Sequence, residues 1–217
     1  MAEEGFIFFA NAYRYGFYYS FFFVDFNSGY LNLWANISGI IANIFTLKLA
    51  PLISNYLALV PKLLIFYFIL YKDSYLIDKF QYKLLLCLLI LLSPFNVPEI
   101  WLNSINSQIF FCILSFLVVF NKNEKKDINY LNLLIILLAG FTGVYTCVLL
   151  PIFFFKYLKF KTLQDKYNLI ILLFCTISQF IIIVFAKATN VLNESKLHTV
   201  DINLINNYFY NVPVKAF

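Results

Sequence analysis

The chain has 217 residues, of which 62% are hydrophobic and only 12% are charged. Its mean hydropathy is +0.80, whereas a soluble domain carries roughly 25% charged and about 45–50% apolar residues. This composition excludes an ordinary soluble domain and predicts an all-α, polytopic helical membrane protein. The net charge of +5 does not indicate nucleic-acid binding, because the basic residues lie in short loops beside apolar runs, as the positive-inside rule describes.

Residues 1–49 are predicted to form helices and a loop on the outer face of the membrane. Residues 6–23 and 30–47 are apolar, but they carry polar side chains among many aromatic ones. This mixture is typical of helices that lie in the membrane interface. The turn-rich segment 25–30 separates the two helices. A transmembrane position for residues 30–47 is an alternative.

A transmembrane bundle is predicted over residues 50–187, and about six membrane-embedded helices are expected in all. The run at residues 50–71 contains Pro61 and Lys62, which predict a kink or a water-facing lysine. The later apolar runs are residues 82–93, 98–120, 128–140, 144–158 and 167–187. Two of them, 128–140 and 144–158, are shorter than the about 20 residues of a crossing, so they form either a hairpin or one long kinked span.

Lysines gather in three clusters, each after an apolar run. The clusters are Lys72, Lys79 and Lys83; Lys122, Lys125 and Lys126; and Lys156, Lys159, Lys161 and Lys166. All three can be cytoplasmic only if residues 128–158 form a hairpin, so the positive-inside rule favours the hairpin. Both ends of the chain then lie on the outer face, and residues 188–217 are an outer-face tail.

The run at residues 98–120 opens with the polar side chains of Glu99, Asn103, Asn106 and Ser107. At about 100° per residue, these side chains share one face of a helix. Polar groups at the mouth of a span cost free energy unless they face protein or water, so they are functional candidates. We expect them to face a cavity shared with the N-terminal helices. Alternatively, the glutamate caps the helix and the asparagines hydrogen-bond to a neighbouring helix.

The four cysteines all lie within apolar runs and have no histidine partners. They are Cys87, Cys112, Cys147 and Cys175. This placement predicts small packing residues rather than disulfides or metal ligands. We expect neither a metal site nor a cofactor.

Four short segments carry a resemblance to a known family. They are Glu3-Glu4-Gly5, residues 26–31, residues 99–108, and residues 140–143 with Pro151. The first segment resembles the acidic motif that follows the first transmembrane helix of GT-C-type membrane glycosyltransferases, which use sugars linked to polyprenyl phosphate. The other segments resemble a group of uncharacterised bacterial membrane proteins of this type. The resemblance covers most of the chain. Because members of the family have further helices, it implies a polypeptide truncated at both ends.

The resemblance implies an integral, multi-pass protein of the bacterial inner (cell) membrane that moves a sugar from a polyprenyl-phosphate donor to an acceptor at the outer face. Glu3 or Glu4 would be the catalytic base. The implied substrate-binding residues are Arg14, Lys62, Glu99, Asn103 and Asn106. Membrane lipids and the lipid-linked sugar donor are the implied partners. A transporter or lipid flippase, and a non-catalytic membrane subunit, are the alternative functions.

Overall fold

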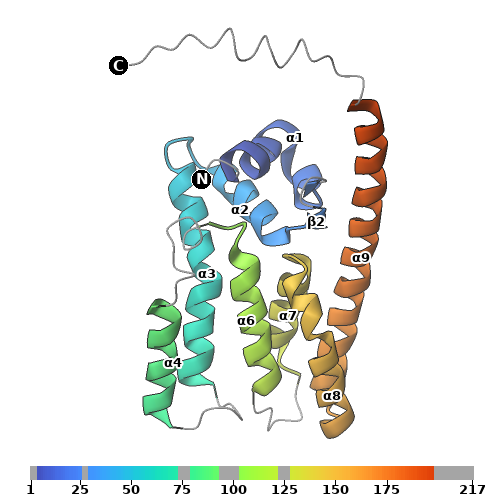
Figure 1. Cartoon of the computed structure of the whole chain (residues 1–217). Helices are drawn as coiled ribbons and strands as arrows, with labels where there is room; N and C mark the ends of the chain where they lie inside the picture. Colours follow the sequence, from blue (N-terminus) through green and yellow to red (C-terminus); the bar gives the residue numbers. More distant parts are fainter. Residues whose placement is uncertain (1–3, 26–28, 73–78, 93–102, 122–127, 198–217) are drawn as a thin grey trace.

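The computed structural model describes residues 4–25, 29–72, 79–92, 103–121 and 128–197. Nearly all of them are helical, which confirms the all-α fold class. The bundle consists of α3 (Ala50–Tyr71), α4 (Phe80–Leu92), α6 (Ser107–Phe120), α7 (Tyr130–Phe141), α8 (Leu150–Phe160) and α9 (Leu163–Leu197). Across one end of the bundle lie η1 (Glu4–Phe9), α1 (Ala10–Phe21) and α2 (Leu33–Ile44), which together we call the N-terminal layer (Figure 1).

Two helices are long and apolar enough to cross a bilayer. They are α3, with 22 residues, and the 27-residue stretch Leu163–Thr189 of α9. Only 33% and 22% of their most apolar windows are buried inside the protein. So much exposed apolar surface requires lipid or another protein to cover it. The other described apolar helices are shorter than a crossing, so the presence of about six membrane-embedded helices stays a prediction.

Helix α3 occupies the predicted run of residues 50–71 from end to end. It begins with Pro51 in its first turn, where the missing N–H of proline is not needed. It continues as one helix through Pro61, and the neighbouring Lys62 is buried. The Lys62 ammonium lies 4.5 Å from the centre of the Phe110 ring in α6. The lysine therefore packs against α6 by a cation–π contact instead of facing water.

The described lysine clusters lie at the end of the bundle opposite the N-terminal layer. The last turns of α3 and α8 meet the first turns of α4 and α9 at that end (Figure 1). The Lys83 ammonium of α4 donates to the carbonyl oxygens of Lys72, at 3.2 Å, and Leu70, at 3.5 Å. It thus satisfies carbonyls that a helix end leaves without partners.

Helices α7 and α8 are separate elements joined through the short helix η3 (Tyr145–Leu149), so the predicted hairpin over residues 128–158 is confirmed. Helix α7 packs closely on α9. A methyl carbon added to Gly140 would lie 2.6 Å from Cβ of Cys175, a separation that real structures do not tolerate. Cys175 is fully buried at this contact, in the packing role expected of it.

Helix α6 begins later than predicted, at Ser107. The Asn103 Oδ1 atom accepts the backbone N–H of Ile105 at 2.8 Å. Such a local side-chain bond competes with helical hydrogen bonding and favours a turn. Asn106 then occupies the residue before the helix and makes no capping bond with its side chain. The prediction that Asn103 and Asn106 share a helical face is therefore wrong, because both precede the helix.

Neighbouring protein buries eight of the twelve residues of α2. It contacts η1 and α1 on one side and α3 on the other. A helix of twelve residues extends about 18 Å, too short for the about 30 Å of a bilayer core, so the transmembrane alternative for residues 30–47 is wrong. Two short antiparallel strands, β1 (Val24–Asp25) and β2 (Tyr30–Leu31), connect α1 to α2. No strand was predicted here.

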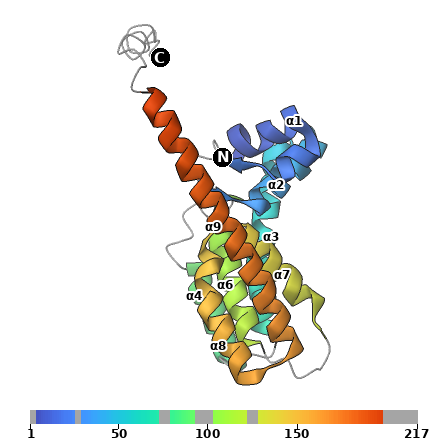
Figure 2. The ribbon, with the colours of Figure 1, turned by 90° about the vertical axis from the view of Figure 1, so that its right-hand side faces the viewer.

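Helix α9 packs against β2 and then runs past the other helices of the bundle (Figure 2). It extends to Leu197, beyond the predicted end of the span at residue 187. The predicted tail, residues 188–217, thus begins within this helix, and residues 198–217 lie outside the described part of the chain.

Candidate functional site

A cavity of about 300 Å³ lies where the N-terminal layer meets the start of α3. This volume falls at the lower end of the range for small-molecule sites. The wall comes from η1, α2, the turn between α2 and α3, the first turns of α3, and the turn that precedes α6. The lining residues are Phe8, Phe9, Ala35, Gly39, Ala42, Leu47, Ala50, Pro51, Ser54 and Ser104.

Close packing between η1 and α2 forms one side of this cavity. A methyl carbon added to Gly39 would lie 2.8 Å from the backbone C and O atoms of Phe8. Glycine at this position therefore lets the backbone of η1 rest directly on α2. The hydroxyls of Ser38 and Ser54, 3.0 Å apart, share a hydrogen bond that joins α2 to α3 beside the cavity.

The η1 segment has π-helical hydrogen bonding. This geometry is rare and occurs frequently at functional sites. Its residues Phe8 and Phe9 line the cavity.

The cavity wall is apolar and carries no charged side chain. Its deep end includes Ala35 and Ser104, which are 0% and 1% exposed, while Leu47 at its outer end is 72% exposed. An ionised group placed inside would lose its hydration without gaining a partner from the wall. The cavity is therefore suited to an apolar group, with any charged part of the same molecule held outside.

The predicted catalytic residues are close in sequence to residues that line this cavity, but the structure does not describe their side chains. Glu4 begins η1, the helix that supplies Phe8 and Phe9. Glu3 and Glu99 lie outside the described residues.

The structure does not gather the other predicted binding residues in the cavity wall. Arg14 lies in α1 with an exposed side chain. Lys62 is twelve residues beyond the start of α3, about 18 Å along the axis, where it packs on α6. Asn103 and Asn106 lie together in the turn before α6 and are half-buried. Their neighbour Ser104 lines the cavity in their place.

Buried amide side chains that sequence reasoning missed hold the N-terminal layer on the bundle. Gln179 of α9 accepts the backbone N–H of Leu31 at 3.0 Å and donates to its carbonyl oxygen at 2.9 Å. The same amide nitrogen also donates to the carbonyl oxygen of Gly140 at 3.2 Å. Gln179 thereby pairs with β2 as a neighbouring strand would. Its signal in the sequence was a polar side chain within a long apolar run.

Two further amides connect the N-terminal layer to α6 and its preceding turn. Asn32 donates through Nδ2 to the carbonyl oxygen of Ile105 at 3.0 Å, and its Oδ1 atom caps α2. Gln108 donates through Nε2 to the Tyr30 hydroxyl at 3.1 Å. These two hydrogen bonds therefore hold the turn that contains Ser104, and the start of α6, against the segment that contains Tyr30 and Asn32.

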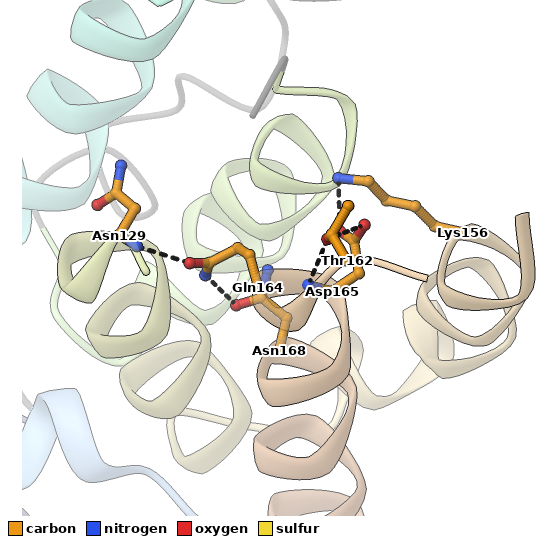
Figure 3. A network of polar contacts seen from close by, with 6 residues as sticks. All are labelled: Asn129, Lys156, Thr162, Gln164, Asp165 and Asn168. Atoms are coloured by element: carbon orange, nitrogen blue, oxygen red, sulfur yellow. Dashed lines mark hydrogen bonds and ion pairs between the residues drawn. The ribbon is translucent and has the colours of Figure 1, made fainter. Parts of the chain in front are cut away.

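A second polar network lies at the opposite end of the bundle (Figure 3). Gln164 of α9 accepts the backbone N–H of Asn129 at 2.6 Å and donates to Oδ1 of Asn168 at 2.9 Å. Both α9 side chains are almost fully buried. Their bonds tie the start of α7 to the start of α9, so this network has a clear structural role.

Comparisons with known proteins give no match to this chain among protein-family models, curated proteins or solved structures. The class that the described residues define is an all-helical protein, in which two of the described helices are suited to crossing a bilayer and an apolar cavity lies at one end.

Proposed function

We propose that the protein is a multi-pass glycosyltransferase of a bacterial inner membrane, which transfers a sugar from a polyprenyl phosphate to an acceptor. The cavity is the observation that carries the proposal. Its wall is apolar and uncharged, and its outer end opens at Leu47 and Pro51, both exposed, beside the first turn of α3. An isoprenoid segment of the donor suits this wall because burying its apolar surface is favourable.

The chemical step rests on the acidic pair Glu3 and Glu4. One carboxylate takes the proton of the acceptor hydroxyl as that oxygen attacks the anomeric carbon, and the polyprenyl phosphate leaves. The pair adjoins η1, whose Phe8 and Phe9 line the cavity. A base there works at the same end of the molecule as a lipid bound in the cavity.

The substrate-binding residues of the proposal also belong mainly to this end. Arg14 supplies a cation in the N-terminal layer, and Asn103 and Asn106 supply amide donors beside Ser104 for the leaving phosphate. Glu99 precedes the same turn in the chain. Lys62 packs deeper in the bundle, on Phe110, so the proposal assigns it no contact with the donor.

The test is sugar transfer by membranes that contain the complete gene product, supplied with labelled polyprenyl-phosphate sugars. Leu47→Trp places a large ring at the cavity mouth, and we expect it to lower transfer at least about 10-fold, the effect of roughly 1.4 kcal/mol. Leu49→Trp is the matched control, because Leu49 is also exposed in the same turn but does not line the cavity. Equal activity of the two variants would argue against the cavity as the donor site.

The catalytic assignment has its own variant in the same assay. Changing Glu3 and Glu4 together to glutamine should abolish transfer while donor binding persists. Full transfer by this variant rules out the acidic pair as the base. Donor binding without transfer by the unaltered protein would favour a transporter, a flippase or a non-catalytic subunit.

A further inference from the structure

The connection between α8 and α9, residues 156–166, carries four lysines and one aspartate, and we call it the α8–α9 corner. Lys156 of α8 reaches Asp165 at the start of α9, with 3.0 Å between Nζ and Oδ1 (Figure 3). The Thr162 hydroxyl donates to the other carboxylate oxygen at 2.6 Å and accepts the Asp165 backbone N–H at 3.1 Å. The only acidic group of the corner is therefore already neutralised inside it.

The other three lysines of the corner, Lys159, Lys161 and Lys166, are exposed. Among the described residues, no ion pair involves any of them. The start of α9 adds the positive end of a helix dipole. The corner thus carries a net charge of +3 with no acid left to compensate it.

Exposed apolar side chains flank these lysines on both helices. Phe155 and Leu158 precede Lys159 and Lys161 in α8, and Leu163 follows them in α9. Each is at least 49% exposed. The corner therefore presents positive charge and apolar surface side by side, which suits a molecule with an anionic head and apolar chains.

We propose that the α8–α9 corner binds the phosphate headgroup of an anionic glycerophospholipid. Lysines near a membrane surface attract anionic lipids, each contributing about 1 kcal/mol, and clusters of them between helices bind such headgroups. A neutral lipid gives the three lysines no anionic partner, and a nucleic acid has no apolar chain to cover Leu158 and Leu163. The corner lies at the opposite end of the bundle from the cavity (Figure 1). This lipid is therefore distinct from the proposed sugar donor and comes from the other leaflet.

The test is titration of short-chain phosphatidylglycerol into the detergent-solubilised full chain, with bound lipid counted by native mass spectrometry. We expect saturable binding that weakens as salt is added, since exposed charges are screened. Changing Lys159, Lys161 and Lys166 together to glutamine should weaken binding at least roughly 10-fold. The corresponding arginine variant should bind like the unaltered protein.

The matched control removes the same charge elsewhere, through Lys72→Gln, Lys79→Gln and Lys187→Gln, and should bind phosphatidylglycerol as the unaltered protein does. Equal loss in the control and corner variants would show an attraction spread over the whole molecule and overturn the proposed site. Equal retention of phosphatidylcholine, or binding that does not respond to salt, would also overturn it. The salt series uses the unaltered protein, so it decides the question even if the glutamine variant does not fold.

Discussion

At the scale of single residues, Gln179 joins three segments that are far apart in the chain. Its amide bonds both backbone groups of Leu31 and the carbonyl oxygen of Gly140, and its side chain is 1% exposed. A buried amide with this many partners stabilises the fold mainly because its loss would leave those partners without bonds.

Gln179→Leu should therefore lower the free energy of unfolding by about 2–4 kcal/mol, because it strands the backbone groups of Leu31. Ser178→Ala is the control, since that hydroxyl bonds only to Phe174 of its own helix. The control should change stability by no more than about 0.5 kcal/mol. Unfolding in mixed detergent micelles measures the free energy of unfolding of both variants. Equal stability of the two would show that Gln179 does not stabilise the fold in this way.

The contact between Gly140 and Cys175 gives a second prediction at this scale. Gly140→Ala should cost about 1–3 kcal/mol, because the new methyl overlaps Cβ of Cys175. Cys175→Gly removes the atoms that the methyl would meet, so Gly140→Ala should cost less in that background. A double-mutant cycle of unfolding free energies measures the difference. The same cost in both backgrounds would mean that α7 and α9 do not meet here.

At the scale of elements, the sequence predicts those helices that an apolar run alone defines. Residues 50–71 become α3 without a shift, and residues 128–158 become a hairpin as the lysine pattern requires. The start of α6 is different, because the Ile105 N–H donates to the Asn103 side chain in the turn that precedes the helix. The spacing of apolar residues does not reveal such a side-chain bond. The predicted polar face therefore included Asn103 and Asn106, which lie before the first residue of α6.

The burial of α2 and the position of the cavity could not be read from the sequence. Both depend on contacts between segments distant in the chain, such as Phe8 against Gly39. The cavity wall is built from glycine, alanine, proline, serine, leucine and phenylalanine residues, which are also ordinary core residues. Their spacing in the sequence does not distinguish residues that line a cavity from residues that fill a core. Arg14 and Lys62 were predicted as binding residues because they are charged, and neither lines the cavity.

The placement of η1 is tested by Gly39→Ala. The added methyl meets backbone atoms of Phe8, which cannot rotate away as a side chain would, so η1 must move. We expect faster amide hydrogen exchange in η1 and weaker donor binding. Ile44→Ala serves as the control, because Ile44 is 76% exposed at the end of the same helix. Unchanged exchange in the glycine variant would contradict the close contact between η1 and α2.

At the scale of the whole molecule, the N-terminal layer with its cavity and the α8–α9 corner occupy opposite ends of the bundle (Figure 1). The positive-inside rule then predicts that the corner faces the cytoplasm and that the N-terminal layer faces outside. Cysteine labelling tests this orientation with Tyr18→Cys and Lys166→Cys, both at exposed positions, after the four native cysteines are replaced by alanine. A membrane-impermeant maleimide added to intact cells should label Tyr18→Cys alone. Labelling of Lys166→Cys in intact cells would reverse the orientation.

The central claim is that the cavity under the N-terminal layer holds the apolar part of a polyprenyl-phosphate sugar. Photocrosslinking with a donor that carries a diazirine on its isoprenoid chain tests it most directly, with the adducts mapped by mass spectrometry. We predict adducts on cavity-lining residues of η1, α2 and the start of α3, suppressed by excess unlabelled donor and by Leu47→Trp but not by Leu49→Trp. Adducts confined to the outward apolar face of α9, unaffected by competitor, would contradict the claim.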